Sequence, residues 1–207
     1  PDSERQLHEA IAQFEQQLQQ LRGFEGAGQP AQNALSNLAY DWASLKAQLK
    51  RPPTPEAALE LQRASESVLQ ASQRVVLELQ QQASSTSGRL INVSGRQRML
   101  SQRISKNYLL LAWGVRDPQL QNDLEQARRE FVQALQELEQ ARENTPELQR
   151  KLAQVRIEWG VFEKAFQINQ GQGEFIPLLV LLSAESILQR MEEITSLYEE
   201  RFLDGRA

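Results

Sequence analysis

The stretch richest in polar chemistry is residues 91–106, which has the sequence INVSGRQRMLSQRISK. It places arginines, serines, glutamines and one glycine on what is otherwise the pattern of a regular helix. Guanidinium groups bind oxyanions through paired N–H donors, and hydroxyl and amide groups supply further donors. This composition therefore favours the binding of a small anion.

The same stretch lies within a positive island of an acidic chain. The 207 residues carry a net charge of −4, yet residues 79–116 contain no Asp or Glu. The island holds six basic residues and gives +6, so the other 17 basic and 27 acidic groups give −10. The six are Arg89, Arg96, Arg98, Arg103, Lys106 and Arg116. A polyphosphate would be repelled by the surrounding negative field, so we expect a small anion as partner and no nucleic acid.

Composition argues against an enzyme. The chain has no Cys and a single His, His8, which disfavours thiol chemistry and histidine-based metal or acid–base sites. The carboxylate pairs Glu192–Glu193 and Glu199–Glu200 lack the Glu-x-x-His spacing of a di-metal bundle and are expected to be solvated. We expect no catalytic residues, no metal and no cofactor.

On a helix, the central stretch has two neighbouring faces. One is apolar and is expected to face a bundle core; its members are Leu90, Val93, Gln97, Leu100, Ile104, Tyr108 and Leu111. The other is small and polar around one arginine; its members are Ile91, Ser94, Gly95, Arg98, Ser101, Gln102 and Ser105. The second face is the candidate binding surface.

Gly95 suggests how that surface is used. A glycine inside a helix costs roughly 1 kcal/mol relative to alanine, which is understandable where another backbone approaches closely. Two such helices crossing at Gly95 in a symmetric dimer would bring two Arg98 side chains together, and an anion between them would relieve their repulsion. The predicted ligand-binding residues are Arg98, Gly95, Ser94, Ser101 and Gln102.

A simpler interpretation of the arginines stays open at this point. Arg98, together with Arg96 and Arg103, would then lie on a solvated or salt-bridged face, as most helical arginines do. Arg96 and Arg103 share a different face from Arg98, and we expect them to pair with acids of adjacent helices.

The pattern along the chain predicts an all-α fold of antiparallel helical bundles. Leu, Ala, Gln, Glu and Arg dominate, and apolar residues recur at intervals of three and four. Proline and glycine clusters divide the chain into six expected helices, at residues 3–22, 30–50, 55–113, 118–143, 146–168 and 174–202. The third would be a long central helix, with residues 84–88, SSTSG, as its weakest point.

An internal repeat organises these helices. At an offset of 117, apolar and aromatic residues recur in order: Phe14, Leu18, Leu21, Leu35, Trp42, Leu45 and Leu49 match Phe131, Leu135, Leu138, Leu152, Trp159, Phe162 and Phe166. At an offset of 119, residues 66–69, ESVL, match residues 185–188, ESIL. We interpret this as a duplication in which both tryptophans are core residues.

The first copy lacks one helix of the second. The segment from 88 to 113 precedes the three matched helices of the second copy, and its counterpart would lie before Pro1. We therefore predict two tandem domains: an incomplete three-helix repeat at 1–87, and a complete four-helix repeat at 88–207. The first bundle is expected either to stand as three helices or to be completed by another chain.

The motif from Asn92 to Arg103, NVSGRQRMLSQR, resembles the opening of the sensor domain named for the type IV pili methyl-accepting chemotaxis transducers, the PilJ-type domain. It is similar, more loosely, to the P-box of nitrate/nitrite sensor histidine kinases. The resemblance implies a periplasmic four-helix bundle that dimerises and binds nitrate, or sometimes nitrite, at the dimer interface. It places the key arginine of the family at Arg98 and its glycine at Gly95.

The expected function is thus a sensory domain that recognises nitrate or a similar oxyanion and signals by helix repacking. The alternative is a structural or protein-interaction bundle without a small ligand, in which the polar face is a dimer seam. The sequence has no stretch of roughly 20 apolar residues and begins without Met or an apolar leader, which is typical of a processed protein or an excised domain. Any link to a membrane would come through segments outside this sequence.

Overall fold

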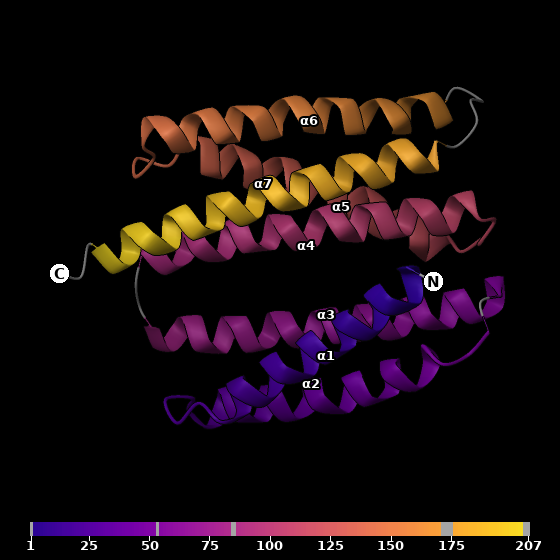
Figure 1. The fold of residues 1–207 in the computed structure, drawn as a ribbon, viewed down its shortest axis with the longest axis horizontal. Coiled ribbons are helices and arrows are strands. Elements are labelled where there is room, and N and C mark those ends of the chain that lie inside the picture. Colours follow the sequence, from indigo (N-terminus) through magenta and orange to yellow (C-terminus); the bar gives the residue numbers. More distant parts are fainter. Residues whose placement is uncertain (1, 53, 84–85, 171–175, 205–207) are drawn as a thin grey trace. The chain divides into compact units, whose positions relative to one another are not determined.

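The computed structural model describes residues 2–52, 54–83, 86–170 and 176–204 (Figure 1). Within these ranges every regular element is a helix, which confirms the all-α prediction. The helices are α1 (Asp2–Arg22), α2 (Gln29–Gln48), α3 (Pro55–Ala83), α4 (Thr86–Ala112), α5 (Pro118–Glu139), α6 (Pro146–Gln170) and α7 (Pro177–Asp204).

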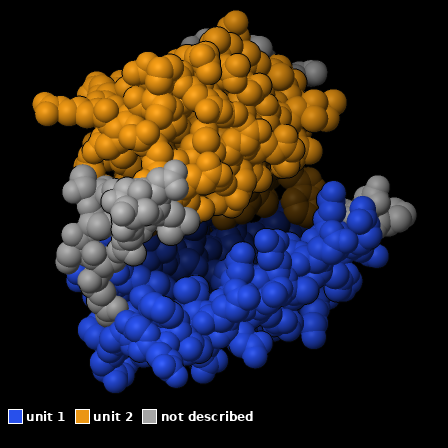
Figure 2. Space-filling view, turned by 60° about the vertical axis from the view of Figure 1, so that its left-hand side comes forward, with its two compact units in different colours: residues 1–84 blue, residues 85–207 orange. Residues whose placement is uncertain are grey.

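The chain divides into two compact units, which Figure 2 shows in different colours. Unit 1 comprises residues 1–84 and contains α1 to α3. Unit 2 comprises residues 85–207 and contains α4 to α7.

One expected helix is in fact two. In place of a single helix over 55–113, the structure has α3 ending at Ala83 and α4 beginning at Thr86. The prediction of one long central helix was therefore wrong. The physical reason lies in the sequence SSTSG, because serine and threonine side chains compete for backbone hydrogen bonds and weaken a helix at that point. Ser84 and Ser85 themselves lie outside the described residues.

Proline-based caps fix the starts of three helices. Thr54 and Thr145 precede Pro55 and Pro146, and each threonine Oγ1 accepts from a backbone N–H three residues on, at 3.2 Å. At α5, Asp117 Oδ1 accepts from the Gln119 N–H at 2.7 Å. Proline at the first helical position has no N–H to leave unsatisfied, so each pair defines a sharp start.

The end of α4 is set by Gly114, whose φ of +93° is a left-handed conformation that favours glycine. The Val115 N–H reaches back to the Leu110 carbonyl at 3.0 Å, and the Arg116 guanidinium donates to the Leu111 carbonyl at 3.0 Å. These bonds satisfy carbonyls that the helix end leaves open. The chain then turns directly into α5.

Unit 2 is a four-helix arrangement in which α4 packs against α5 and α7, and α6 packs against the same two helices. The core face of α4 is as predicted: Leu90, Gln97, Leu100, Ile104, Tyr108 and Leu111 are buried, and Val93 is half-buried. Several predicted bounds in unit 2 differ, and α7 runs from Pro177 to Asp204 where residues 174–202 were expected. Helix α5 ends at Glu139 instead of residue 143, because Asn144 donates to the Leu138 carbonyl at 2.7 Å and closes that end. Helix α6 continues to Gln170.

In unit 1, α2 packs against both α1 and α3. Leu18 of α1, Leu35 of α2 and Val75 of α3 belong to its buried cluster. Trp159 of unit 2 is buried as predicted, whereas its counterpart Trp42 is only half-buried. The expectation that both tryptophans are core residues thus holds fully only in unit 2.

Candidate anion site on helix α4

The polar face of α4 divides into a buried part and a half-exposed part. Ser94, Ser101 and Ser105 are buried, and the hydroxyls of the first two donate to the carbonyls of Ile91 and Arg98 in their own helix, at 2.9 and 2.8 Å. The Thr195 hydroxyl of α7 lies 3.1 Å from Ser94 Oγ. Ser94 therefore lies at the contact between α4 and α7, and the three buried serines differ in exposure from the half-exposed Arg98.

Gly95, Arg98 and Gln102, at intervals of three and four along α4, are half-exposed, and so is Ile91. A Cβ placed on Gly95 would meet nothing within 4 Å. Gln102 donates through Nε2 to the Ala184 carbonyl of α7 at 3.3 Å, so its amide oxygen points elsewhere. Of the five predicted ligand-binding residues, the structure thus brings three together on one outer stripe and places Ser94 and Ser101 inside the bundle.

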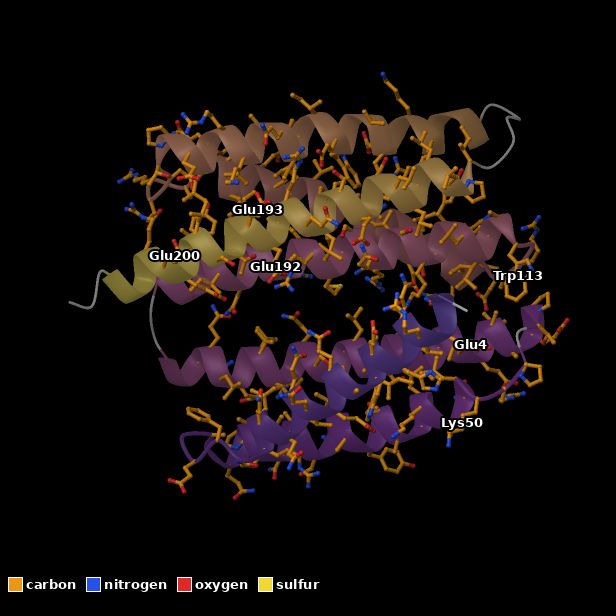
Figure 3. The ribbon with its side chains drawn as sticks, viewed as in Figure 1. Glu4, Lys50, Trp113, Glu192, Glu193 and Glu200 are labelled. Atoms are coloured by element: carbon orange, nitrogen blue, oxygen red, sulfur yellow. The ribbon has the colours of Figure 1, made fainter. Side chains whose placement is uncertain are left out.

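Arg98 pairs across the helix interface with Glu192 of α7, which Figure 3 labels. The side chains are 36% and 54% exposed, and an ion pair in such a setting contributes little net stability. The Nε of Arg98 is buried and, within the described residues, has no hydrogen-bond partner. Arg98 therefore has hydrogen-bonding capacity that the pairing with Glu192 does not use.

The other two arginines of the motif bind acids of the adjacent helix α5, as predicted. Arg96 pairs with Glu130 at 2.8 Å, and Arg103 approaches Asp123 at 3.9 Å. Sequence alone indicated these pairings because both arginines lie away from the Arg98 face. They leave Arg98 as the arginine of this motif that is directed toward α7.

Two residues near Arg98 were missed at the level of sequence. Glu192 was expected to be merely solvated, and Thr195 was not singled out at all. Both lie far from α4 along the chain, and no local pattern signals a contact across that distance. The antiparallel packing of α4 on α7 is what brings them to Arg98 and Ser94.

The outer stripe of α4 continues into an apolar hollow of about 480 Å³. Gln102 and Lys106 lie at its polar side, and Leu109, Trp113 and Leu181 line it. Trp113, labelled in Figure 3, is 48% exposed, and Leu181 is 50% exposed. Large apolar side chains exposed next to a charged stripe are typical of an interaction surface.

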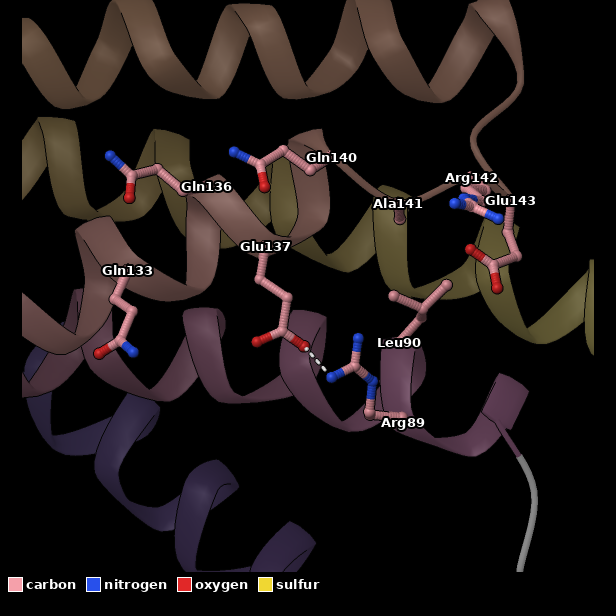
Figure 4. A pocket seen from close by; sticks show the side chains of 9 residues that line it. All are labelled: Arg89, Leu90, Gln133, Gln136, Glu137, Gln140, Ala141, Arg142 and Glu143. Atoms are coloured by element: carbon pink, nitrogen blue, oxygen red, sulfur yellow. Dashed lines mark ion pairs between the residues drawn. The ribbon is translucent and has the colours of Figure 1, made fainter.

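A second hollow lies at the other end of α4, where Figure 4 shows it. Its volume is about 500 Å³, and glutamines of α5 line it together with the pair Arg89–Glu137, whose atoms are 3.1 Å apart. Its lining carries two arginines, Arg89 and Arg142, and two carboxylates, Glu137 and Glu143, so this hollow lacks the net positive character that an anion requires.

Within the described ranges, no three His, Asp or Glu side chains gather closely enough to hold a metal ion. Among the same residues, no helix is both long enough and apolar enough to cross a membrane.

Comparison with known proteins identifies the region around this site. The sequence model of one family, described as the N-terminal domain of the type IV pili methyl-accepting chemotaxis transducers, PilJ, matches residues 79–194. That match begins near the end of α3 and includes α4, α5, α6 and most of α7. No curated protein and no solved structure matches the chain. The chain belongs to the PilJ family, and unit 2 carries most of the matched region, a sensory domain of chemotaxis signalling.

Proposed function

We propose that unit 2 senses nitrate or a similar small oxyanion, bound by Arg98 where two copies of α4 meet. The observation that carries the proposal is the state of Arg98, with a buried, unpartnered Nε and a half-exposed carboxylate as its partner. An oxyanion offers in-plane acceptors for a guanidinium fork, which one carboxylate of a neighbouring helix does not fully satisfy.

Gly95 supports a second copy as the other half of the site. Within one chain nothing requires glycine there, because the surrounding space is open. A glycine in a helix interior destabilises the helix, so its presence is understandable where another backbone packs on it. The exposed Trp113 and Leu181 further along the same surface would be covered in the same contact.

The Arg98–Glu192 pair offers a route from binding to signalling. An anion that takes over the Arg98 guanidinium releases Glu192 and with it one tie between α4 and α7. A ligand shifts a conformational equilibrium only by its difference in affinity for the two states. Here the two states differ in whether Arg98 faces Glu192 or the anion. The family's domain is typically extracellular or periplasmic, and we propose that location for this one.

A second candidate function follows from the same pair. If Glu192 is the permanent partner of Arg98, the outer stripe of α4 with Trp113 and Leu181 is a protein-interaction surface without a small ligand. The apolar character of the hollow favours this alternative, because an anion gains nothing from leucine and tryptophan walls.

Isothermal titration calorimetry with nitrate, nitrite, sulfate and chloride separates the two. We expect heat with nitrate that is lost in Arg98→Ala and kept in the control Arg96→Ala, whose side chain pairs with Glu130 instead. Glu192→Gln should strengthen binding a few-fold, since the competing carboxylate is gone. If no anion binds the unaltered protein, or if Arg96→Ala abolishes binding as completely as Arg98→Ala, the proposal is wrong.

A further inference from the structure

Unit 1 and unit 2 share the geometry of their aromatic centres. Phe14 stacks on Trp42 with ring centroids 4.1 Å apart and planes at 26°, and Phe131 stacks on Trp159 at 4.3 Å and 20°. The positions differ by 117 in both cases. Helices α1, α2 and α3 can therefore be matched with α5, α6 and α7, with an offset of 119 for the last pair.

Matched in this way, the described residues of unit 1 hold a counterpart for each helix of unit 2 except α4. In unit 2, α4 packs against α5 and α7 on the side away from α6. In unit 1, α2 packs against α1 and α3 as α6 does against their counterparts, but no described helix of unit 1 corresponds to α4. In unit 2, α5 and α7 share a surface that α4 covers. We call the corresponding surface of α1 and α3 in unit 1 the open slot.

The open slot exposes apolar residues whose counterparts are buried. Leu7 and Leu21 of α1 are each 37% exposed, whereas Leu124 and Leu138 are 6% and 0% exposed. Val76 of α3 is 38% exposed, whereas Thr195 is 4% exposed. The Thr195 hydroxyl lies 3.1 Å from Ser94 of α4, so its counterpart Val76 faces the open slot directly.

At the edges of the open slot, unit 1 lacks the acids that pair with α4 in unit 2. In unit 2, four arginines of α4 pair with Glu137, Glu130, Asp123 and Glu192. At the four matched positions, unit 1 has glutamine without exception: Gln20, Gln13, Gln6 and Gln73. A helix with the arginines of α4 would find no carboxylate there.

From these two differences we infer that the open slot of unit 1 binds an amphipathic partner helix with one apolar ridge and uncharged, hydrogen-bonding residues on both flanks. The exposed leucines and valine of the open slot would pack against the apolar ridge of the partner helix. The glutamines at its edges would donate hydrogen bonds to, and accept them from, neutral polar residues on the flanks of that helix. The same glutamines make the slot discriminate against arginine-bearing helices such as α4. This inference does not depend on the anion site.

Two synthetic peptides test it on the full chain. The first has the sequence of Thr86–Ala112 with Arg89, Arg96, Arg98 and Arg103 replaced by glutamine; the second keeps the four arginines. We expect the glutamine peptide to bind unaltered protein, measured by fluorescence anisotropy, and the arginine peptide to bind about fivefold or more weakly. The order should reverse in a variant with Gln6→Asp, Gln13→Glu, Gln20→Glu and Gln73→Glu.

A blocking variant locates the contact. The double variant Leu21→Asp with Val76→Asp places charges on the apolar surface of the open slot. It should weaken the binding of the glutamine peptide by about tenfold or more. The two side chains are 37% and 38% exposed, so we expect the fold to tolerate the change, which circular dichroism of the variant checks. Ile157→Asp, at a 69% exposed position on α6, is the matched control and should leave binding unchanged.

Three results would overturn the inference. The first is that neither peptide binds, and the second is that binding survives the blocking variant. The third is that ultracentrifugation shows a dimer which the blocking variant dissociates, without peptide binding, since a second copy would then be the occupant. Nitrate titration of the same blocking variant keeps the two proposals apart, because the anion response should persist there.

Discussion

The two units have the same aromatic stack but enclose it to different degrees. Phe131 is fully buried and Trp159 nearly so, while Phe14 and Trp42 are half-buried. The distance between the ring centroids is 4.1 Å in unit 1 and 4.3 Å in unit 2, a difference of only 0.2 Å. The stack therefore has the same geometry in a unit of three described helices and in one of four, and it is more fully enclosed in the unit of four.

The units also differ in the polar tie at the end of the bundle. In unit 2, the Tyr198 hydroxyl donates to Asn144 at 2.6 Å, and burial raises the pKa of Tyr198 to about 12. The matched positions in unit 1 are Ala27 and Leu79. A closed bundle can protect a buried hydrogen bond from water, whereas the more open unit 1 uses apolar residues at both positions.

The largest expected effect comes from removing one ring of the aromatic stack in each unit. Phe131→Ala removes a fully buried ring and should destabilise unit 2 by about 3–5 kcal/mol. Phe14→Ala should cost unit 1 clearly less, because part of that ring is already in water. Urea unfolding followed by tryptophan fluorescence measures both, with Trp159 and Trp113 reporting on unit 2 and Trp42 on unit 1.

Single-tryptophan versions of each variant provide the control, since they assign each transition to one unit. Equal losses in the two units would contradict the difference in enclosure. A loss from Phe131→Ala that appeared in the Trp42 signal as well would mean that the units do not unfold independently.

Sequence was enough to predict the helices and the core face of α4, for reasons that are local. Apolar spacing at threes and fours places Leu100, Ile104 and Tyr108 on one side, and the structure buries all three. Proline after threonine or aspartate marks starts such as those at Pro118 and Pro146. The break between α3 and α4 was underestimated because a weak stretch in a strong pattern does not by itself show where a helix stops.

The candidate site was less accessible to sequence reasoning, because it depends on which helix α4 packs against. The helical spacing placed the serines and Arg98 on one face of α4. A neighbouring helix can bury some residues of such a narrow face and leave others exposed. The bundle buries Ser94, next to Thr195 of α7, and Ser101, and it leaves Gly95 and Arg98 half-exposed. Glu192, which decides the electrostatics of Arg98, could be found only from the packing.

The polar tie gives the next largest effect. Asn144→Ala leaves the Tyr198 hydroxyl without its acceptor and removes the side-chain hydrogen bond to the Leu138 carbonyl, which keeps the Ala141 N–H as donor, and it should cost unit 2 about 1–3 kcal/mol. Tyr198→Phe should cost less, because Asn144 keeps its bond to Leu138. Denaturant unfolding of both and of the double variant measures their coupling. Strictly additive losses would mean that the hydrogen bond between them contributes nothing.

A smaller effect, of opposite sign, concerns two helix glycines, Gly95 of α4 and Gly160 of α6. A Cβ added to either would meet nothing within 4 Å, and the repeat has Ala43 where unit 2 has Gly160. Each change to alanine should stabilise unit 2 by about 0.5–1 kcal/mol in dilute thermal unfolding. Gly95→Ala alone should also weaken self-association in sedimentation, because the proposed crossing lies there. Identical sedimentation of both variants would count against that crossing.

The smallest effect compares two exposed carboxylates, one in each unit. A hydrogen bond from Lys46, at 2.5 Å, and a second from Trp42, at 3.3 Å, lower the pKa of Glu15 below its ordinary 4.5. A hydrogen bond from Lys151, at 2.6 Å, similarly lowers the pKa of Glu193. A carboxylate whose pKa is lower in the folded than in the unfolded chain adds stability above that ordinary value. The added stability is lost as the pH falls through the folded pKa.

Carboxyl-carbon NMR titrations of Lys46→Met and Lys151→Met should therefore differ. Glu193 loses its main partner, so its pKa should return most of the way to 4.5. Glu15 keeps the indole N–H of Trp42, so its pKa should rise but stay lowered. Full return of Glu15 would mean that the half-buried Trp42 does not hold this carboxylate in solution. The aromatic stack of unit 1 would then lack the polar anchor that distinguishes it from the stack of unit 2.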